Sequence, residues 1–176
     1  MASLSSVAVF ADCEATAHQA LYRQAGAIIA RHGAHLHCLA RNGDWPRALV
    51  ESALAGGGQV TVASAPTQQP LAVSQGVSVL TAGSEPDAGT RIVEAAQVVI
   101  GLPGSIETAG ALYASWTAAG GAAANRPVGL LNHNRAYEVV RGFAADVASV
   151  GRSNIDALLQ VSDNFEDLWN RLTRLV

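Results

Sequence analysis

Short apolar runs alternate with longer amphipathic segments along the whole chain. The apolar runs predict strands at residues 6–10, 34–39, 59–63, 77–81, 98–102, 128–131 and 158–161. Apolar positions at helical spacing predict helices at about 16–31, 44–55, 86–96, 106–119 and 137–149, and a last helix from 164. Strands and helices that alternate this regularly form right-handed crossovers and a mainly parallel sheet. We therefore expect an α/β fold, a single doubly wound Rossmann-like domain over residues 1–176 with helices on both faces of the central sheet.

Residues that commonly begin or end helices support these boundaries. Gly33 follows the first helix, as a residue that readily adopts a positive φ should. Asp44 is expected to cap the second helix, with Pro46 in its first turn. Asp163, with Glu166 three residues later, has the spacing of a capping box at the start of the last helix.

The composition favours a protein whose apolar surface is partly covered by another subunit. Of all residues 49% are hydrophobic and only 14% are charged, which is an oily balance for 176 residues. All 11 basic residues are Arg, and the net charge is −3. The sequence has no basic stripe interleaved with aromatic residues, so we expect no nucleic-acid partner.

The cysteines and the N-terminus bear on the cellular compartment. Cys13 and Cys38 form neither a CxxC motif nor a disulfide framework. The first seven residues lack the positive n-region of a signal peptide, and no apolar run reaches membrane-spanning length. We expect a cytoplasmic protein without a membrane segment.

One strand-to-helix junction carries most of the functional signal. The apolar run at 98–102 breaks at Pro103-Gly104 and continues at once as a helix. Such a turn points the first N–H groups and the positive end of the helix beyond the sheet, where a phosphate or carboxylate binds well. Ser105 is a natural N-cap for this helix. Glu107, however, places a carboxylate in the first helical turn, where an anionic ligand would lie.

The predicted topology also says which loops lie together. Ligands of doubly wound sheets bind beyond the carboxyl ends of the strands, at a switch in strand order. This rule places residues 11–14, 39–45, 81–87 and 103–108 around one cleft. The expected ligand contacts are Asp12, Asn42, Pro103, Gly104, Ser105, Ile106, Glu107 and Thr108. We expect a nucleotide or a sugar-phosphate-like small molecule as the ligand, and neither a cofactor nor a metal.

Four segments of the chain resemble a known family. They are Val7-Ala8-Val9-Phe10, Ser52-Ala53-Leu54-Ala55-Gly56-Gly57-Gly58-Gln59-Val60, Val99-Ile100-Gly101-Leu102-Pro103-Gly104 and Arg126-Pro127-Val128-Gly129-Leu130-Leu131-Asn132. In these segments and in overall spacing the chain resembles the Lonely Guy (LOG) family, nucleoside 5′-monophosphate phosphoribohydrolases once described as lysine decarboxylases. The resemblance covers nearly the whole chain, and it implies a Rossmann-like fold, a nucleotide cleft and a homodimer.

The motifs that carry the family's chemistry are altered in this chain. In the family signature PGGxGTxxE, glycine backbone holds the nucleotide phosphate and the glutamate serves the ribose and base. Ser105 and Glu107 stand where the signature has glycines, and Ala111 stands at its glutamate. The family's arginine falls on Ala88 by the same register. The inherited positions then offer no side chain that could stabilise an oxocarbenium-like sugar or assist the departing base.

Three functions therefore stay open. The first is a divergent LOG-like protein whose cleft binds a nucleotide or related small ligand, with hydrolase activity lost or weak. The second is a working N-glycosidic hydrolase or related enzyme of altered specificity that uses Glu107 and Arg91. Glu107 also suits the positive end of its own helix, and Arg91 also suits a solvated helix face. The third is a non-catalytic dimeric scaffold or sensor, with Tyr113, Trp116 and the small residues 118–124 at a close interface.

Other reactive side chains have structural explanations as well. His35 and His37 have an H-x-H spacing that can chelate a metal, but no third ligand lies near them in the sequence. Cys13 is a candidate nucleophile, yet no histidine is placed to activate it, and His18 lies five residues on. Cys38 points to the opposite face of its strand and is expected in the core.

Overall fold

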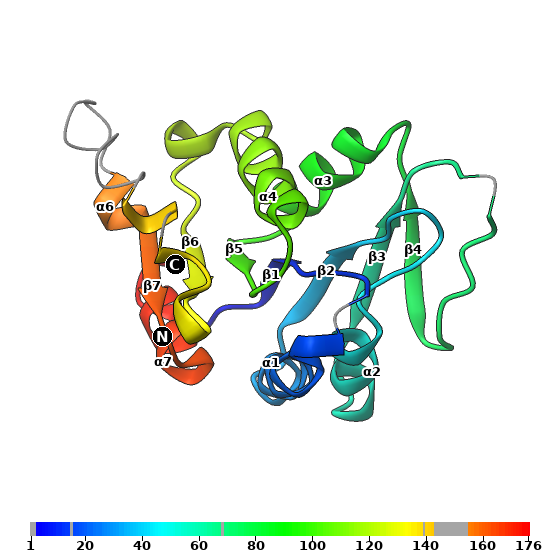
Figure 1. The fold of residues 1–176 in the computed structure, drawn as a ribbon, viewed down its shortest axis with the longest axis horizontal. Helices are drawn as coiled ribbons and strands as arrows, with labels where there is room; N and C mark the ends of the chain where they lie inside the picture. The colour runs from blue at the N-terminus through cyan, green and yellow to red at the C-terminus, as the bar shows by residue number, and fades with distance from the viewer. Residues whose placement is uncertain (1–2, 15, 68, 139, 143–154) are drawn as a thin grey trace.

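The computed structural model describes residues 3–14, 16–67, 69–138, 140–142 and 155–176. At its centre lies a seven-stranded sheet in the order β4-β3-β2-β1-β5-β6-β7, and each neighbouring pair is parallel (Figure 1). The strands are β1 (Ser6–Phe10), β2 (His35–Leu39), β3 (Val60–Ser64), β4 (Val77–Thr81), β5 (Val98–Gly101), β6 (Val128–Leu131) and β7 (Leu159–Ser162). The doubly wound, Rossmann-like α/β fold predicted from the apolar pattern is confirmed.

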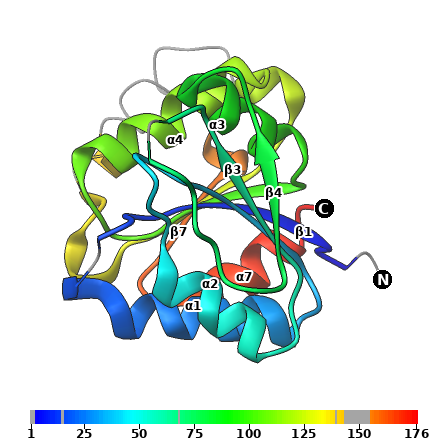
Figure 2. The same cartoon turned by 90° about the vertical axis from the view of Figure 1, so that its right-hand side faces the viewer.

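Helices cover both faces of the sheet. The α-helices are α1 (Gln19–Arg31), α2 (Arg47–Ala55), α3 (Glu85–Glu94), α4 (Ile106–Ala118), α6 (Ile155–Leu158) and α7 (Phe165–Thr173). Short 3₁₀ turns are η1 (Thr16–His18), η2 (Gly121–Ala124) and η3 (His133–Arg135). Figure 2 shows α1, α2 and α7 on one face of the sheet and α3 and α4 on the other. Among the described residues, no helix is long and apolar enough to cross a membrane.

The core consists of two apolar clusters, one on each face of the sheet. The larger cluster packs Tyr22 of α1, Leu49 of α2 and Leu168 of α7 against inward residues of β1, β2 and β5. The smaller one packs Ile92 of α3 and Leu112 of α4 against the opposite side. Because both faces are covered, the central strands are apolar at nearly every position, as a parallel sheet requires.

The element boundaries agree closely with the sequence pattern. Three strands have the predicted bounds, and the other four differ by one residue at one or both ends. Gly33 ends α1 with a φ of 71°, as predicted. The helix predicted at 137–149 falls largely on residues 143–154, outside the described part of the chain.

Two predicted helix caps are wrong. Pro46 stands at the N-cap position of α2, and the Asp44 backbone instead pairs with Arg41 in a tight turn. The Asp44 carboxylate accepts hydrogen bonds from the Trp45 N–H and the Arg47 Nε–H, at 2.9 and 3.1 Å. At α7 the cap is Asn164, whose side chain accepts the Asp167 N–H at 3.0 Å.

The strand order reverses at β1. Strands β2 to β4 extend from one side of β1, and β5 to β7 extend from its other side. The loops that leave β1 and β5 therefore diverge to opposite faces and open a crevice at the carboxyl edge of the sheet.

Candidate functional site

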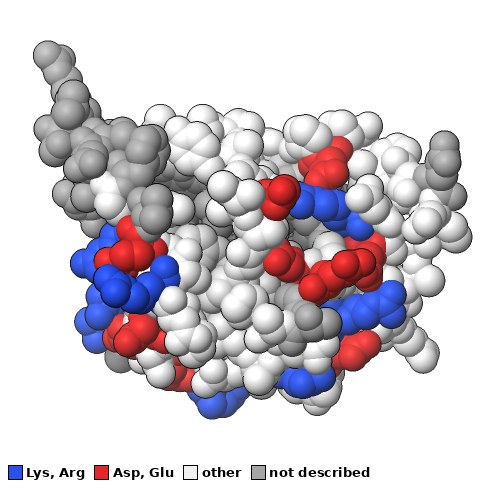
Figure 3. All heavy atoms as spheres, viewed as in Figure 1, with Lys and Arg blue, Asp and Glu red and all other residues white. Residues whose placement is uncertain are grey.

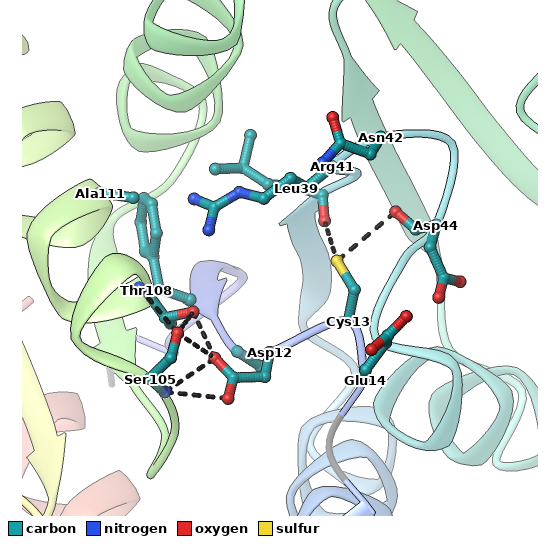
Figure 4. Close-up of a pocket in the computed structure, with 12 residues that line it drawn as sticks. Asp12, Cys13, Glu14, Leu39, Arg41, Asn42, Asp44, Ser105, Thr108 and Ala111 are labelled. Carbon is teal, nitrogen blue, oxygen red and sulfur yellow. Dashed lines mark hydrogen bonds between the residues drawn. The ribbon is translucent and has the colours of Figure 1, made fainter. Parts of the chain in front are cut away.

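A cavity of about 470 Å³ lies at this crevice, with walls from three segments (Figure 4). Asp12, Cys13 and Glu14 come from the loop after β1, Arg41, Asn42 and Asp44 from the loop after β2, and Ser105, Thr108 and Ala111 from the start of α4. Polar and charged side chains thus surround a space large enough for a small organic molecule.

The Asp12 carboxylate lies against the N-terminus of α4. The Ser105 N–H donates to both Asp12 oxygens, at 2.9 and 2.8 Å, and the Ser105 hydroxyl donates to Oδ1 at 3.0 Å. The Thr108 hydroxyl donates to the same oxygen. A Cβ added at Gly104 would lie 2.6 Å from Asp12 Oδ1, so only glycine leaves room for this approach.

The same contacts set the ionisation of Asp12. Burial opposes the charged carboxylate, but hydrogen bonds from Thr108 and Ser105 outweigh it and hold the pKa of Asp12 below its ordinary value. Asp12 is therefore an anion at neutral pH, placed where the positive end of α4 favours one.

Two buried tyrosines hold the turn that precedes α4. The Tyr22 hydroxyl donates to the Pro103 carbonyl at 2.6 Å and accepts the Asp12 N–H at 3.0 Å. The Tyr137 hydroxyl donates to the Leu102 carbonyl. Burial raises the pKa of both phenols, so both stay protonated and donate. Tyr22 thereby joins two walls of the cavity.

The wall that follows β2 contributes the guanidinium of the cavity lining. Arg41 Nε donates to Glu85 Oε1 of α3 at 2.6 Å. Figure 4 shows the Arg41 side chain extending across the cavity toward α4. Its loop turns back at Asn42 and Gly43, which have φ of 52° and 81°. This left-handed pair suits Asn and Gly and directs Arg41 and Asp44 toward the same space.

Cys13 has the environment of a structural thiol. Its S–H lies 3.5 Å from the Asp44 carbonyl and 4.0 Å from that of Leu39. Burial raises the pKa of the Cys13 thiol to about 11, so the nucleophilic thiolate is scarce at neutral pH. Cys38 is fully buried in the core, as predicted.

The structure gathers some of the expected contact residues at the cavity and leaves others outside it. Asp12, Asn42, Ser105 and Thr108 line the cavity. The residues of the expected set that lie outside its lining are Pro103, Gly104, Ile106 and Glu107. Ile106 is 83% exposed, and Glu107 is an exposed residue in the first turn of α4. No residue of the loop 81–87 is in the lining, and Glu85 of this loop accepts a bond from the lining residue Arg41.

The two alanines at the positions where the LOG-family resemblance implies catalytic residues differ in their surroundings. Ala111 lines the cavity, whereas Ala88 belongs to α3 and is fully buried. Arg91 lies outside the lining, half-exposed on α3, and its Nε donates to Asp87 at 3.2 Å. Three charged residues of the lining, Arg41, Glu14 and Asp44, are absent from the ligand contacts expected from the sequence. The Asn42-Gly43 dipeptide was the available signal, because it predicts a tight turn after β2.

The histidine pair on β2 is arranged as a stack. The His35 and His37 rings lie 4.2 Å apart at 17°, so their in-plane lone pairs run parallel instead of converging on one ion. Burial, followed by the neighbouring His35, lowers the pKa of His37 to about 4. Among the described residues, no group of three or more His, Cys, Asp or Glu side chains could hold a metal ion.

Fold and cavity together define the class, an α/β protein with a polar crevice at its strand-order switch. No family model matches the chain, and no curated protein matches it. The molybdenum cofactor carrier protein of Chlamydomonas reinhardtii has a similar structure, with a TM-score of 0.73 and 17% identity over 98% of both chains. The molybdenum cofactor binding protein of the phototrophic bacterium Rippkaea orientalis has a TM-score of 0.70 and 15% identity, over 99% of this chain and 98% of that one. The structural-genomics target TM1055 has a TM-score of 0.69 and 15% identity, over 97% and 99%. At these identities the likeness shows the Rossmann-like fold alone.

Proposed function

We propose that this chain is a divergent LOG-like protein that binds a small polar molecule in the cavity and hydrolyses nucleotides weakly or not at all. The observation that carries the proposal is the α4 wall of the cavity. Ala111 lines it at the position of the family's glutamate, and a methyl group cannot donate or accept a proton. The side chain that would assist a departing base is therefore missing from that wall.

The LOG-family reaction also requires that the nucleotide phosphate be bound, and the start of α4 hinders this binding. The Ser105 N–H and the hydroxyls of Ser105 and Thr108 are already bonded to Asp12. A nucleotide phosphate would have to displace this carboxylate or lie beside it. Both alternatives weaken binding of a nucleoside 5′-monophosphate in the family's orientation.

Two structural neighbours favour a ligand-binding function over a catalytic one. One is a molybdenum cofactor carrier protein and the other a molybdenum cofactor binding protein. By analogy, the cavity here retains its ligand without breaking a bond in it. Nucleosides, which carry no phosphate, are the first candidate ligands, and the molybdenum cofactor of these two neighbours is the comparison ligand.

The alternative is an active N-glycosidase of altered specificity. Glu107 and Arg91 would supply its acid or base and its cation. Neither side chain lines the cavity, and Arg91 is already paired with Asp87. This arrangement favours the binding function.

We further propose that the protein is a homodimer formed through α4. Ile106 and Tyr113 are large apolar residues that are 83% and 62% exposed on this helix. Their spacing of seven residues places them on one helix face, with the exposed Gly110 between them. A second copy of the chain would cover this face, and the dimer would serve a scaffold or sensor role equally well.

An assay of AMP hydrolysis and ligand binding tests the proposed function. The full chain is incubated with AMP, and released adenine is measured by chromatography beside an Ala111→Glu variant. We expect wild-type turnover at least about 10²-fold below that of ordinary enzymes, because loss of one catalytic donor costs about 10²–10³ in rate. The variant is expected to gain turnover if the inherited geometry survives.

The binding half of the proposal has its own measurement. Thermal unfolding is followed with adenosine, AMP and the molybdenum cofactor, since a ligand at 100 times its Kd stabilises the fold by about 2.7 kcal/mol. AMP turnover at about 1–10³ s⁻¹ would contradict the loss of catalysis. The absence of stabilisation by every ligand offered would contradict the binding function.

A further inference from the structure

The end of the cavity at α4 is occupied by a carboxylate that belongs to the protein. Asp12 Oδ1 accepts three hydrogen bonds, from the Ser105 N–H, the Ser105 hydroxyl and the Thr108 hydroxyl. Among the described residues, Asp12 Oδ2 accepts one, from the same Ser105 N–H at 2.8 Å. A carboxylate oxygen accepts two bonds or more, and Asp12 lines the cavity, so Oδ2 can accept a bond from a ligand.

We propose that Asp12 determines the charge of the ligand: it reserves the α4 end of the cavity for a neutral or cationic hydrogen-bond donor and excludes phosphate and carboxylate groups. This inference rests on the proposed binding function and goes beyond it by naming the ligand class. An amide, an amidine, an amine or a sugar hydroxyl meets the requirement, because each offers an N–H or O–H to Oδ2.

The rest of the lining strengthens this selectivity. Glu14 and Asp44 add two carboxylates, and Arg41 contributes the guanidinium. The Nε of Arg41 is bonded to Glu85, and Asp44 is paired with Arg47 at 3.1 Å. Figure 3 shows acidic side chains gathered on this face of the molecule, with basic ones among them. The lining carries the three carboxylates of Asp12, Glu14 and Asp44 against the guanidinium of Arg41, so its formal charge is negative and opposes an incoming anion.

The surroundings of Asp12 hold its carboxylate in one position. Gly104 gives the carboxylate room beside the turn, since a Cβ there would lie 2.6 Å from Oδ1. Tyr22 fixes the Asp12 N–H at 3.0 Å. Both the backbone and the side chain of Asp12 are thus held by hydrogen bonds. A ligand must therefore bind to the carboxylate in the position that it already has.

Three probes of one shape separate the charge classes. Benzamidine, benzamide and benzoate share a ring and carry a cationic, a neutral and an anionic group. Each is titrated to millimolar concentration into the ¹⁵N-labelled full chain, and the amide shifts of Ser105, Thr108 and Arg41 are followed. We expect benzamidine and benzamide to bind at least about tenfold more tightly than benzoate, a difference of about 1.4 kcal/mol. Benzoate binding as tightly as the other two would overturn the inference and leave the binding function intact. If none of the three probes shifts these resonances, both the inference and the proposed binding function would be contradicted.

A matched pair of variants assigns the effect to Asp12. Asp12→Asn keeps the size of the side chain and removes its charge, and Glu14→Gln does the same to a carboxylate two residues away in the same loop. Benzoate affinity should rise at least about tenfold in Asp12→Asn and much less in Glu14→Gln. Equal gains in the two variants would show that overall charge excludes anions, which would overturn the role assigned to Asp12. The wild-type comparison decides the selectivity even if a variant fails to fold.

Discussion

At the scale of single residues, Asp12 links the stability of the fold to pH. Its pKa is lowered in the folded protein by bonds from Thr108 and Ser105, against the effect of burial. A carboxyl with a depressed folded pKa contributes stability above its unfolded pKa, near 3.8, and loses it as the pH falls through the folded value. We therefore expect the unfolding free energies of wild type and Asp12→Asn to differ most above pH 3.8 and to converge at lower pH.

Chemical unfolding from neutral to strongly acid pH measures this difference. The comparison with Asp12→Asn is needed because Asp87, Glu166 and Asp167 also have lowered pKa values and add their own acid dependence. A gap between the two proteins that stays constant down to pH 2 would show that the charge of Asp12 contributes nothing.

Tyr22 is the second residue whose role can be isolated. Tyr22→Phe leaves the Pro103 carbonyl and the Asp12 N–H without their partner, which should cost about 1–3 kcal/mol of unfolding free energy. Tyr137→Phe is the matched control, because it removes a bond to Leu102 in the same turn without touching Asp12. Both variants should unfold at lower urea, but only Tyr22→Phe should shift the Ser105 amide resonance strongly. Similar shifts of the Ser105 amide resonance in both variants would mean that Tyr22 does not fix the Asp12 loop more than Tyr137 does.

At the scale of elements, the turn between β5 and α4 depends on one glycine. Gly104→Ala would place a Cβ 2.6 Å from Asp12 Oδ1, so the carboxylate or the turn must move. Gly110→Ala, inside α4, meets no atom within 4 Å and should stabilise the helix by about 0.5–1 kcal/mol. Urea unfolding of the two variants should therefore give shifts of opposite sign. A stabilised Gly104→Ala would show that Asp12 is not held close to this turn.

The elements themselves could be predicted from the sequence, and the side chains of the cavity only in part. Apolar runs placed every strand within one residue because a parallel sheet buried on both faces needs continuous apolar segments. The rule of the strand-order switch found the loops of Asp12 and Asn42. It could not tell that Asp12 would bind the start of α4, since that contact joins residues 93 positions apart. The sequence pattern points to Glu107 because this residue is close to Pro103-Gly104 along the chain, but Glu107 is exposed in the first turn of α4 and lies outside the lining.

At the scale of the whole molecule, the two halves of the sheet meet at β1, and the charged side chains of the cavity come from the loops after β1 and β2. The α1, α2 side carries the larger core, with Tyr22 reaching across to the turn after β5. The α4 side has an exposed apolar face, so it is the side that a second subunit would cover.

Self-association through α4 is the prediction that belongs to this scale. Tyr113→Asp places a charge on the exposed face of α4, where burial against a partner would make it costly. We expect sedimentation equilibrium to give a dimer for wild type and a largely monomeric Tyr113→Asp. Val79→Asp is the control, since Val79 is 47% exposed on the edge strand β4, away from α4. A dimer disrupted by Val79→Asp alone would place the interface at the sheet edge, and a monomeric wild type would remove the homodimer from the proposal. Because Ala111 of the cavity lies on the same helix as Tyr113, a dimer through α4 would also limit how far the cavity wall can move.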